Sequence, residues 1–186
     1  MKKFPYRETA GALMWTATMT RPDIACAVRA VVRFCENPGS AHKKAVMKNF
    51  QYLLHTKKWG ITYGGQGCGL CMEACTDSDF GACLDTRRSV SGAVLMLAKG
   101  AISWHSRMQE VTASGTSEAE YVALSELATS KHASRRAKHT DVKHHLVRDT
   151  VRVEYVRSED QHVDLLTKPL DVQMFCKHAK FIPNVV

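Results

Sequence analysis

The sequence has no long hydrophobic run, because none of its apolar stretches approaches the ~18 residues that a membrane-spanning helix needs. It also begins without a secretory pattern, since Met1-Lys2-Lys3 is followed by Phe4-Pro5 rather than by an apolar segment. These two absences predict a chain that neither spans a membrane nor is secreted. We therefore expect it in the cytoplasm or the nucleus.

Cysteine occurs in an odd number, seven, and no export signal accompanies it, so reduced thiols are expected rather than a disulfide framework. Four of the seven lie close together in the sequence: Cys68, Cys71, Cys75 and Cys83. The Cys68-x-x-Cys71 pair has no second Cys-x-x-Cys or His-x-x-x-His at the usual zinc spacing. Free cysteine is also a common small core residue, so free thiols are favoured, although the pattern alone leaves metal binding open.

Acidic residues are scarce, since 18 Asp and Glu stand against 26 Lys and Arg and the formal net charge is +8. Much of the excess lies between Lys131 and Arg152, where seven basic residues accompany two acids. A basic excess favours a polyanionic partner, because neutralising phosphates releases counterions whatever the base sequence. This segment has two interpretations, a solvated basic loop and a nucleic-acid contact. The candidate contact residues are Arg135, Arg136, Lys138 and Lys143.

The first third of the chain has helical periodicity. Residues 7–19 place four apolar side chains on one face at i, i+3, i+4 and i+7, namely Ala10, Leu13, Met14 and Ala17. A second helix is expected from Pro22 to about Cys35, and a third from an N-cap at Ser40 to about His55. The apolar stripe of the third consists of Ala45, Val46, Phe50, Leu53 and Leu54. Residues 1–58 therefore predict a small helical segment without chemistry of its own.

From Gly60 onward the pattern changes to that of strands and helices in alternation. Strands over 70–76, 90–97 and 101–106 predict an antiparallel meander, with Asp77 directly after its first strand. A helix over 117–128 and a half-buried strand over 151–156 follow. A Ser158-x-x-Gln161 capping box then opens a final helix through Thr167. This order predicts an α/β domain over 59–186.

Three acids on separate expected elements are candidate metal ligands: Asp77, Glu120 and Asp164. Carboxylates so far apart in sequence can meet only through folding, and hard oxygen ligands are what Mg²⁺ or Mn²⁺ requires. Each acid also has a plain structural interpretation. Asp77 is then a turn acid, Glu120 a capping partner of Ser117, and Asp164 a solvated helical acid.

Short sequence words around these acids occur in a characteristic order. They are Pro5-Tyr6-Arg7-Glu8, Thr20-Arg21-Pro22-Asp23-Ile24-Ala25, Asn37-Pro38-Gly39, Gly60-Ile61-Thr62-Tyr63, Asp85-Thr86-Arg87-Arg88-Ser89-Val90-Ser91-Gly92, Ala101-Ile102-Ser103-Trp104, Ser117-Glu118-Ala119-Glu120-Tyr121, Lys138-His139-Thr140-Asp141-Val142 and Val163-Asp164-Leu165-Leu166-Thr167-Lys168. Together they resemble the C-terminal end of a copia-type retrotransposon polyprotein, where the reverse transcriptase runs into its ribonuclease H domain. The resemblance covers nearly the whole chain.

The resemblance implies a fold, an activity and partners. Residues 1–58 would be the helical reverse transcriptase tail, and residues 59–186 a ribonuclease H-like mixed sheet with flanking helices. The implied reaction is hydrolysis of the RNA strand of an RNA–DNA hybrid, with Asp77, Glu120 and Asp164 as metal ligands and Mg²⁺ or Mn²⁺ as cofactor. The implied partners are the hybrid, or another nucleic acid, and the remainder of the Pol polyprotein. In an intact element the protein would work in a cytoplasmic virus-like particle.

One part of the family pattern is missing from this sequence. In relatives a long helix is followed by a strand that carries a further acid, whereas here Ala128 runs almost directly into Lys131. The resemblance therefore implies an internal deletion near 128–131, a truncated sheet and the loss of one metal-binding carboxylate. We expect an inactive or nearly inactive enzyme. The alternatives are a non-catalytic basic nucleic-acid-binding remnant and a partly folded relic.

Overall fold

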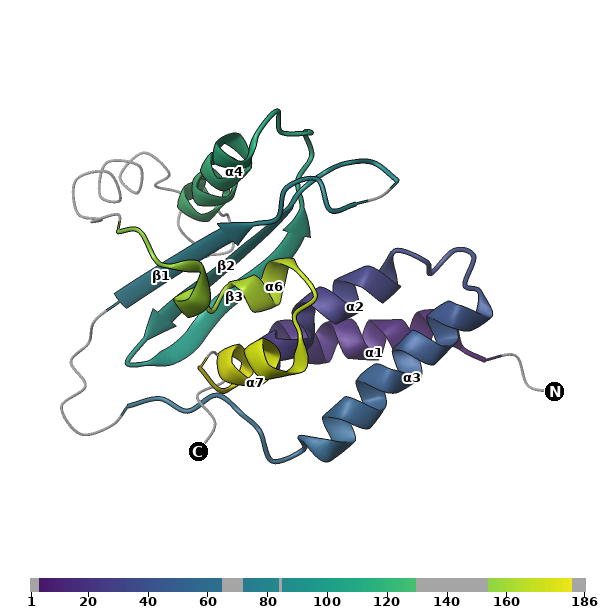
Figure 1. Cartoon of the computed structure of the whole chain (residues 1–186). Helices are drawn as coiled ribbons and strands as arrows, with labels where there is room; N and C mark the ends of the chain where they lie inside the picture. The colour runs from purple at the N-terminus through teal and green to yellow at the C-terminus, as the bar shows by residue number, and fades with distance from the viewer. Residues whose placement is uncertain (1–3, 65–71, 84, 130–153, 182–186) are drawn as a thin grey trace, which may run out of the picture.

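The computed structural model describes residues 4–64, 72–83, 85–129 and 154–181. These residues form N-terminal helices and a three-stranded sheet with helices on both of its faces (Figure 1). The elements are α1 (Tyr6–Met19), the 3₁₀ helix η1 (Pro22–Ile24), α2 (Ala25–Val32), α3 (Ser40–His55), β1 (Met72–Ser78), β2 (Val90–Leu97), β3 (Gly100–Met108), α4 (Thr116–Thr129), the 3₁₀ helix η2 (Ser158–Asp160), α6 (Asp164–Thr167) and α7 (Val172–Phe181). No helix among the described residues is long and apolar enough to cross a membrane.

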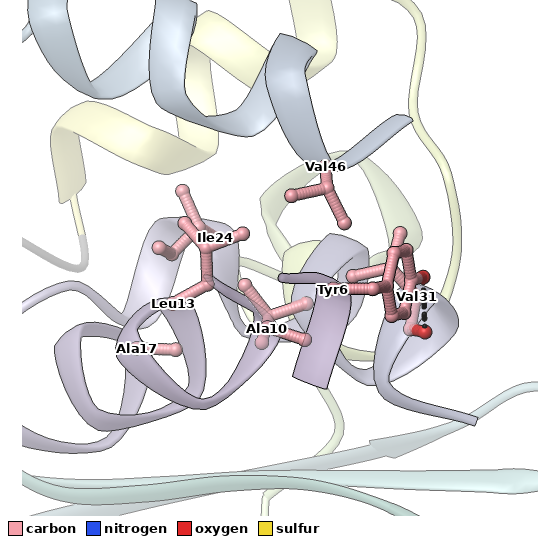
Figure 2. Close-up of a cluster of buried hydrophobic side chains, with 8 residues drawn as sticks. Tyr6, Ala10, Leu13, Ala17, Ile24, Val31 and Val46 are labelled. Atoms are coloured by element: carbon pink, nitrogen blue, oxygen red, sulfur yellow. Dashed lines mark hydrogen bonds between the residues drawn. The ribbon is translucent and has the colours of Figure 1, made fainter. Parts of the chain in front are cut away.

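The N-terminal helices enclose one hydrophobic core, as their periodicity predicts. Figure 2 shows Tyr6, Leu13 and Val46 among the buried side chains that gather between α1, α2 and α3. The Tyr6 hydroxyl donates a hydrogen bond to the Val31 carbonyl at 2.8 Å and so joins α1 to α2. Two expected core residues are wrong, because Met14 is 50% exposed and Leu54 is 68% exposed. The buried residues of α1 are Tyr6, Ala10, Leu13 and Ala17.

The Arg21-Pro22-Asp23 word forms a buried clamp. Two Arg21 nitrogens, Nε and Nη2, donate to the two Asp23 carboxylate oxygens at 2.8 and 2.6 Å, and both side chains are almost fully buried. Arg21 Nη1 also donates to the Thr56 carbonyl at 3.1 Å, and the Tyr52 hydroxyl donates to Asp23 at 2.7 Å. Because Tyr52 lies on α3 and Thr56 caps its C-terminus, the clamp ties the loop after α1 to the end of α3.

The sheet is the antiparallel meander that the sequence predicts, in the order β1-β2-β3. Its first strand is shifted relative to the prediction, since it runs from Met72 to Ser78 and therefore includes Asp77. Asp77 pairs with Gly92 of β2, and Val94 of β2 pairs with Trp104 of β3. Trp104 Nε1 donates to the Ala17 carbonyl at 2.7 Å, so the sheet is fastened to helix α1.

The two faces of the sheet carry different helices. Gly92 and Val94 face α6, which buries Val163 and Leu166 against them. The alternate residue Ser91 faces α4, where Gln109 Nε2 donates at 2.9 Å both to Ser91 Oγ and to the Ala119 carbonyl. Successive residues of a strand point to opposite faces, so this alternation places α6 and α4 on opposite sides of β2.

Gly92 lies where α6 approaches the sheet most closely. A Cβ at this position would lie 2.7 Å from Thr167 Cγ2 and 3.0 Å from Leu166 Cβ. We expect Gly92→Ala to destabilise the protein by about 1–3 kcal/mol, because α6 must move to relieve the overlap. Urea unfolding measures the change. The matched control is Gly11→Ala on α1, where no atom lies within 4 Å of the new Cβ and a small gain is expected. Equal effects of the two substitutions would contradict the close approach.

The C-terminal part departs from the prediction. Residues 151–153 lie outside the described residues, and 154–156 are not in a strand, because Tyr155 is 87% exposed and has no strand partner among the described residues. The single helix expected from Ser158 to Thr167 is instead the turn η2 followed by the short α6. Gln161 does not close a capping box with Ser158 but donates to the Thr76 carbonyl of β1 at 3.1 Å. A further helix, α7, was not predicted.

Helix α7 is joined to the segment before α6 by a histidine pair. His178 is fully buried, and its Nδ1 lies 2.9 Å from Nδ1 of His162. One ring must therefore be neutral and accept, at its unprotonated Nδ1, the hydrogen bond that the other ring donates. Burial and the mutual proximity of the rings lower the pKa of His162 to about 4, and burial and Lys177 lower the pKa of His178.

The histidine pair predicts a loss of stability in acid. Lys177 and Lys168 oppose protonation of these rings and Asp160 favours it, with a net lowering of both pKa values. The unfolded chain binds protons from about pH 6.5 downward, whereas the folded His162 does so only near pH 4. Stability is therefore complete above pH 6.5 and falls as the pH drops toward 4. After allowance for solvent exposure we expect about 1–2 kcal/mol from His162, measured by urea unfolding at several pH values. His162→Gln should remove this component, and an unchanged pH dependence would contradict it.

Candidate functional site

Two of the three predicted acids, Asp77 and Asp164, come together on the α6 face of the sheet. Asp77 points to this face because its cross-strand partner is Gly92, and paired residues share a face. Asp164 is the first residue of α6, and α6 packs across the strands. The hydroxyl of Thr167 at the end of α6 donates a hydrogen bond to Asp77 Oδ2. Two acids that are 87 positions apart in the sequence are thus brought together by the packing of α6 against β1.

Lys168 is the cation of this pair. Its Nζ lies 2.8 Å from Asp164 Oδ2, and the Asp164 side chain is 8% exposed. Burial raises the pKa of Asp164, the hydrogen bond from Lys168 offsets part of that rise, and the neighbouring Asp77 adds to it. Burial lowers the pKa of Lys168, but the hydrogen bond to Asp164 and the charges of Asp77 and Asp164 raise it above its ordinary value. The ammonium of Lys168 is therefore held charged beside the carboxylates.

Asp79 closes the β1–β2 connection beside this group. Its Oδ1 accepts a hydrogen bond from the Val90 backbone N–H at 2.6 Å, and its own N–H donates to the Val90 carbonyl at 3.1 Å. Burial raises the pKa of this carboxyl, and the bond from Val90 and the charge of Arg29 counter the rise. Because its carboxylate accepts a backbone hydrogen bond, Asp79 has a structural role in the β1–β2 connection.

Glu120 does not join the pair. It lies exposed on α4, and no described contact connects it to Asp77 or Asp164. It is not the capping residue either, because Glu118 accepts the hydrogen bonds from the Ser114 N–H and hydroxyl. The structural interpretation of Glu120 as a capping partner of Ser117 is therefore wrong.

The donor atoms of this group decide whether it can hold a metal ion. Within the described ranges no three His, Cys, Asp or Glu side chains are placed to hold a metal ion. Asp77 and Asp164 offer carboxylate oxygens of the right kind, but Asp164 is already bound to Lys168 and Asp77 to Thr167. Magnesium demands near-octahedral oxygen coordination, and two ions need more carboxylates than two. These residues do not fit a two-metal centre.

Some of the other predicted site residues lie within the described residues and some do not. Arg135, Arg136, Lys138 and Lys143 lie outside the described residues, as do Cys68 and Cys71. Cys75 and Cys83 are free thiols, and burial raises the pKa of Cys75.

Similarity to known proteins identifies the origin of these residues. The chain is 32% identical over 217 residues to the retrovirus-related Pol polyprotein from transposon TNT 1-94 of Nicotiana tabacum, a match that takes in 95% of this chain and 16% of that protein. It is 28% identical over 216 residues to the retrovirus-related Pol polyprotein from transposon RE1 of Arabidopsis thaliana, over 95% of this chain and 15% of that protein. The chain is homologous to Pol polyproteins of copia-type retrotransposons.

This homology covers part of a much longer protein, since the chain spans about a sixth of the length of these two polyproteins. Secreted RxLR effector protein 161 of Plasmopara viticola is also related, with 35% identity over 126 residues, 68% of this chain and 88% of that protein. No protein-family model matches the chain, and neither does any solved structure.

The lengths of the matches differ in an informative way. The TNT 1-94 match is 217 residues long, 31 more than the 186 residues of the whole chain, so at least 31 positions of that Pol polyprotein have no counterpart here. The Plasmopara match is 126 residues long and takes in 68% of the chain, so the two aligned stretches are about equal. The Pol polyprotein therefore carries residues within the matched span that this chain lacks.

Sequence reasoning missed the groups that hold the acids in place. Lys168 and Thr167 belong to one of the quoted words, yet neither was assigned a role. One signal was present, since a Lys four residues after an Asp on a helix is a favourable ion pair. The bond from Thr167 to Asp77 crosses 90 positions and has no local signal.

Proposed function

We propose that this chain is the part of a retrotransposon Pol polyprotein in which the tail of the reverse transcriptase meets a ribonuclease H-like domain that has lost an internal segment. The observation that carries the proposal is the approach of Asp77 on β1 to Asp164 on α6, two of the acids that the family resemblance implies as metal ligands. Homology over 95% of the chain supports it. In this proposal residues 1–58 are the helical tail and residues 59–186 the ribonuclease H-like domain.

We further propose that the chain as it stands does not cleave RNA–DNA hybrids. An intact enzyme of this kind would use Mg²⁺ or Mn²⁺ ions to activate water and to stabilise the leaving oxygen. Here Lys168 neutralises the carboxylate that an ion would need, and Glu120 lies exposed without contact to the pair. The residues that Pol relatives have and this chain lacks are consistent with a missing ligand.

In this proposal the domain keeps a partner even without catalysis. An RNA–DNA hybrid is the substrate of the intact activity, and such a duplex is recognised by its shape and its 2′-hydroxyls more than by its bases. The basic residues Arg135, Arg136, Lys138 and Lys143 would contribute to its binding through their charge. In an intact element the remainder of the Pol polyprotein would be covalently attached.

Assays of hybrid cleavage by the unmodified chain test this function. Purified protein is incubated with a labelled RNA–DNA hybrid in Mg²⁺ and in Mn²⁺, beside Asp77→Asn. We expect no difference between the two proteins. Cleavage that depends on Mg²⁺ and is abolished by Asp77→Asn would contradict the proposal, because it would require a substitute for the missing ligand.

A further inference from the structure

Helix α3 and the turn after it form a second basic region that the sequence analysis did not single out. The chain has no Asp or Glu between Glu36 and Glu73, and this span contains five lysines. All five are exposed: Lys43, Lys44, Lys48, Lys57 and Lys58. We call these residues the α3 basic stripe. An acid-free span of this length concentrates positive charge on one surface.

The helical geometry of α3 gathers the lysines on its outward face. At 3.6 residues per turn, the exposed residues of α3 from Lys43 to His55 fall within an arc of ~140°. The opposite face carries the fully buried Val46, and Phe50 and Leu53 pack against the same core. Helix α3 has 16 residues and is therefore about 24 Å long. The stripe is thus held rigidly by the core beneath it.

No ion pair between described residues engages a lysine of the stripe. The ion pairs of the described ranges involve Arg21, Arg33, Arg157, Lys168 and Lys177, and none includes a stripe lysine. Asp23, which lies on the adjacent η1, is buried and bound by Arg21 and Tyr52. The nearest acid in sequence is Glu36, before the N-terminus of the helix. Unpaired ammonium groups in a row are free to neutralise an external polyanion.

We propose that the α3 basic stripe binds the phosphate backbone of a nucleic-acid duplex, in the first place an RNA–DNA hybrid. This inference rests on the proposed function for its partner and adds a surface on the helical tail, away from Asp77 and Asp164. The positive charge of the lysines favours phosphate groups. Lysine contacts to phosphate do not depend on the base sequence, so we expect the stripe to contact the backbone rather than the base edges. An anionic membrane fits less well, because a helix that lies on a membrane buries its apolar face there, and the apolar face of α3 is already packed in the core.

The experiment compares two triple variants that change the net charge equally. Lys43, Lys44 and Lys48 are replaced by Gln in the test variant, and the exposed Arg7, Arg107 and Arg157 are replaced by Gln in the control. Hybrid binding is measured by fluorescence anisotropy over a range of salt concentrations. We expect the test variant to lose about tenfold or more in affinity at low salt, and its slope of log K against log salt to fall by about 2–3. The control variant should retain most of the affinity.

Each other result decides against the stripe. Equal losses in both variants would show a general charge effect. Full binding by the test variant, with loss on replacing Arg135, Arg136, Lys138 and Lys143, would assign binding to that segment alone. Absence of hybrid binding by the unmodified chain would overturn the stripe, while the cleavage tests would still judge the proposed function separately. Stronger retention of the unmodified chain on phosphatidylserine vesicles than on the hybrid would identify a lipid surface instead.

Discussion

Cleavage of RNA–DNA hybrids is expected to return when the segment that the Pol relatives have and this chain lacks is inserted into the chain. The insertion is placed between Ala128 and Lys131, where the sequence words of the family are brought together. Mispositioning at a catalytic site alone can lower the rate by ~10²-fold, and here a ligand and its supporting strand would both be absent. We therefore expect the restored protein to exceed the chain as given by at least ~10²-fold in Mg²⁺-dependent cleavage.

The control for this experiment is an insertion of equal length made of Gly and Ser. This control lengthens the connection without supplying the side chains of the inserted segment. It therefore shows whether the added length alone restores cleavage. Asp77→Asn in the restored protein should abolish the recovered activity. If the Gly and Ser insertion restored cleavage equally, the missing ligand would not explain the inactivity of the chain.

Breaking the buried clamp of the N-terminal helices is expected to cause the largest loss of stability. Arg21→Met leaves the Asp23 carboxylate without its cation, and the Asp23 side chain has no exposure to solvent. Removal of one partner of a buried ion pair costs about 3–5 kcal/mol, because the remaining charge is uncompensated. We expect a loss of this size in urea or thermal unfolding of Arg21→Met.

Two further variants show whether the buried charge is the cause. The double variant Arg21→Met with Asp23→Asn should recover part of the loss, because no buried charge then remains. Arg33→Met breaks an exposed pair with Asp85, 3.5 Å apart, and should cost less than about 1 kcal/mol. A loss in Arg21→Met as small as that in Arg33→Met would show that the clamp contributes little to the fold.

Local pattern was sufficient for the elements that depend on near neighbours in the sequence. The periodicity of apolar residues located α1 and α3, and the strand pattern with its turns located the meander. The apolar pattern gave wrong predictions at the edges of the buried helix faces, where the packing of neighbouring helices determines which side chain is buried. Tyr6 is buried in the core with its hydroxyl bonded to the Val31 carbonyl of α2, whereas Met14 is half exposed.

The candidate site could be predicted only as a set of acids. The resemblance to the family implied Asp77 and Asp164 as ligands, and folding brings these two together. The resemblance could not show that Lys168 would pair with one of them. The capping box predicted from Ser158 and Gln161 was wrong for the same reason. The side chain of Gln161 donates its hydrogen bond to the Thr76 carbonyl of β1, 85 positions earlier in the chain. Long-range partners of this kind leave no local trace in the sequence.

We propose that Asp77 and Asp164 are the remnant of a metal site in which Lys168 now balances the charge. Isothermal titration of Mg²⁺ and Mn²⁺ into the unmodified chain tests this proposal, with Asp77→Asn and the restored protein measured in parallel. We expect no saturable binding that depends on Asp77 in the unmodified chain, and such binding in the restored protein. Saturable binding of either ion by the chain as given, lost in Asp77→Asn, would contradict it.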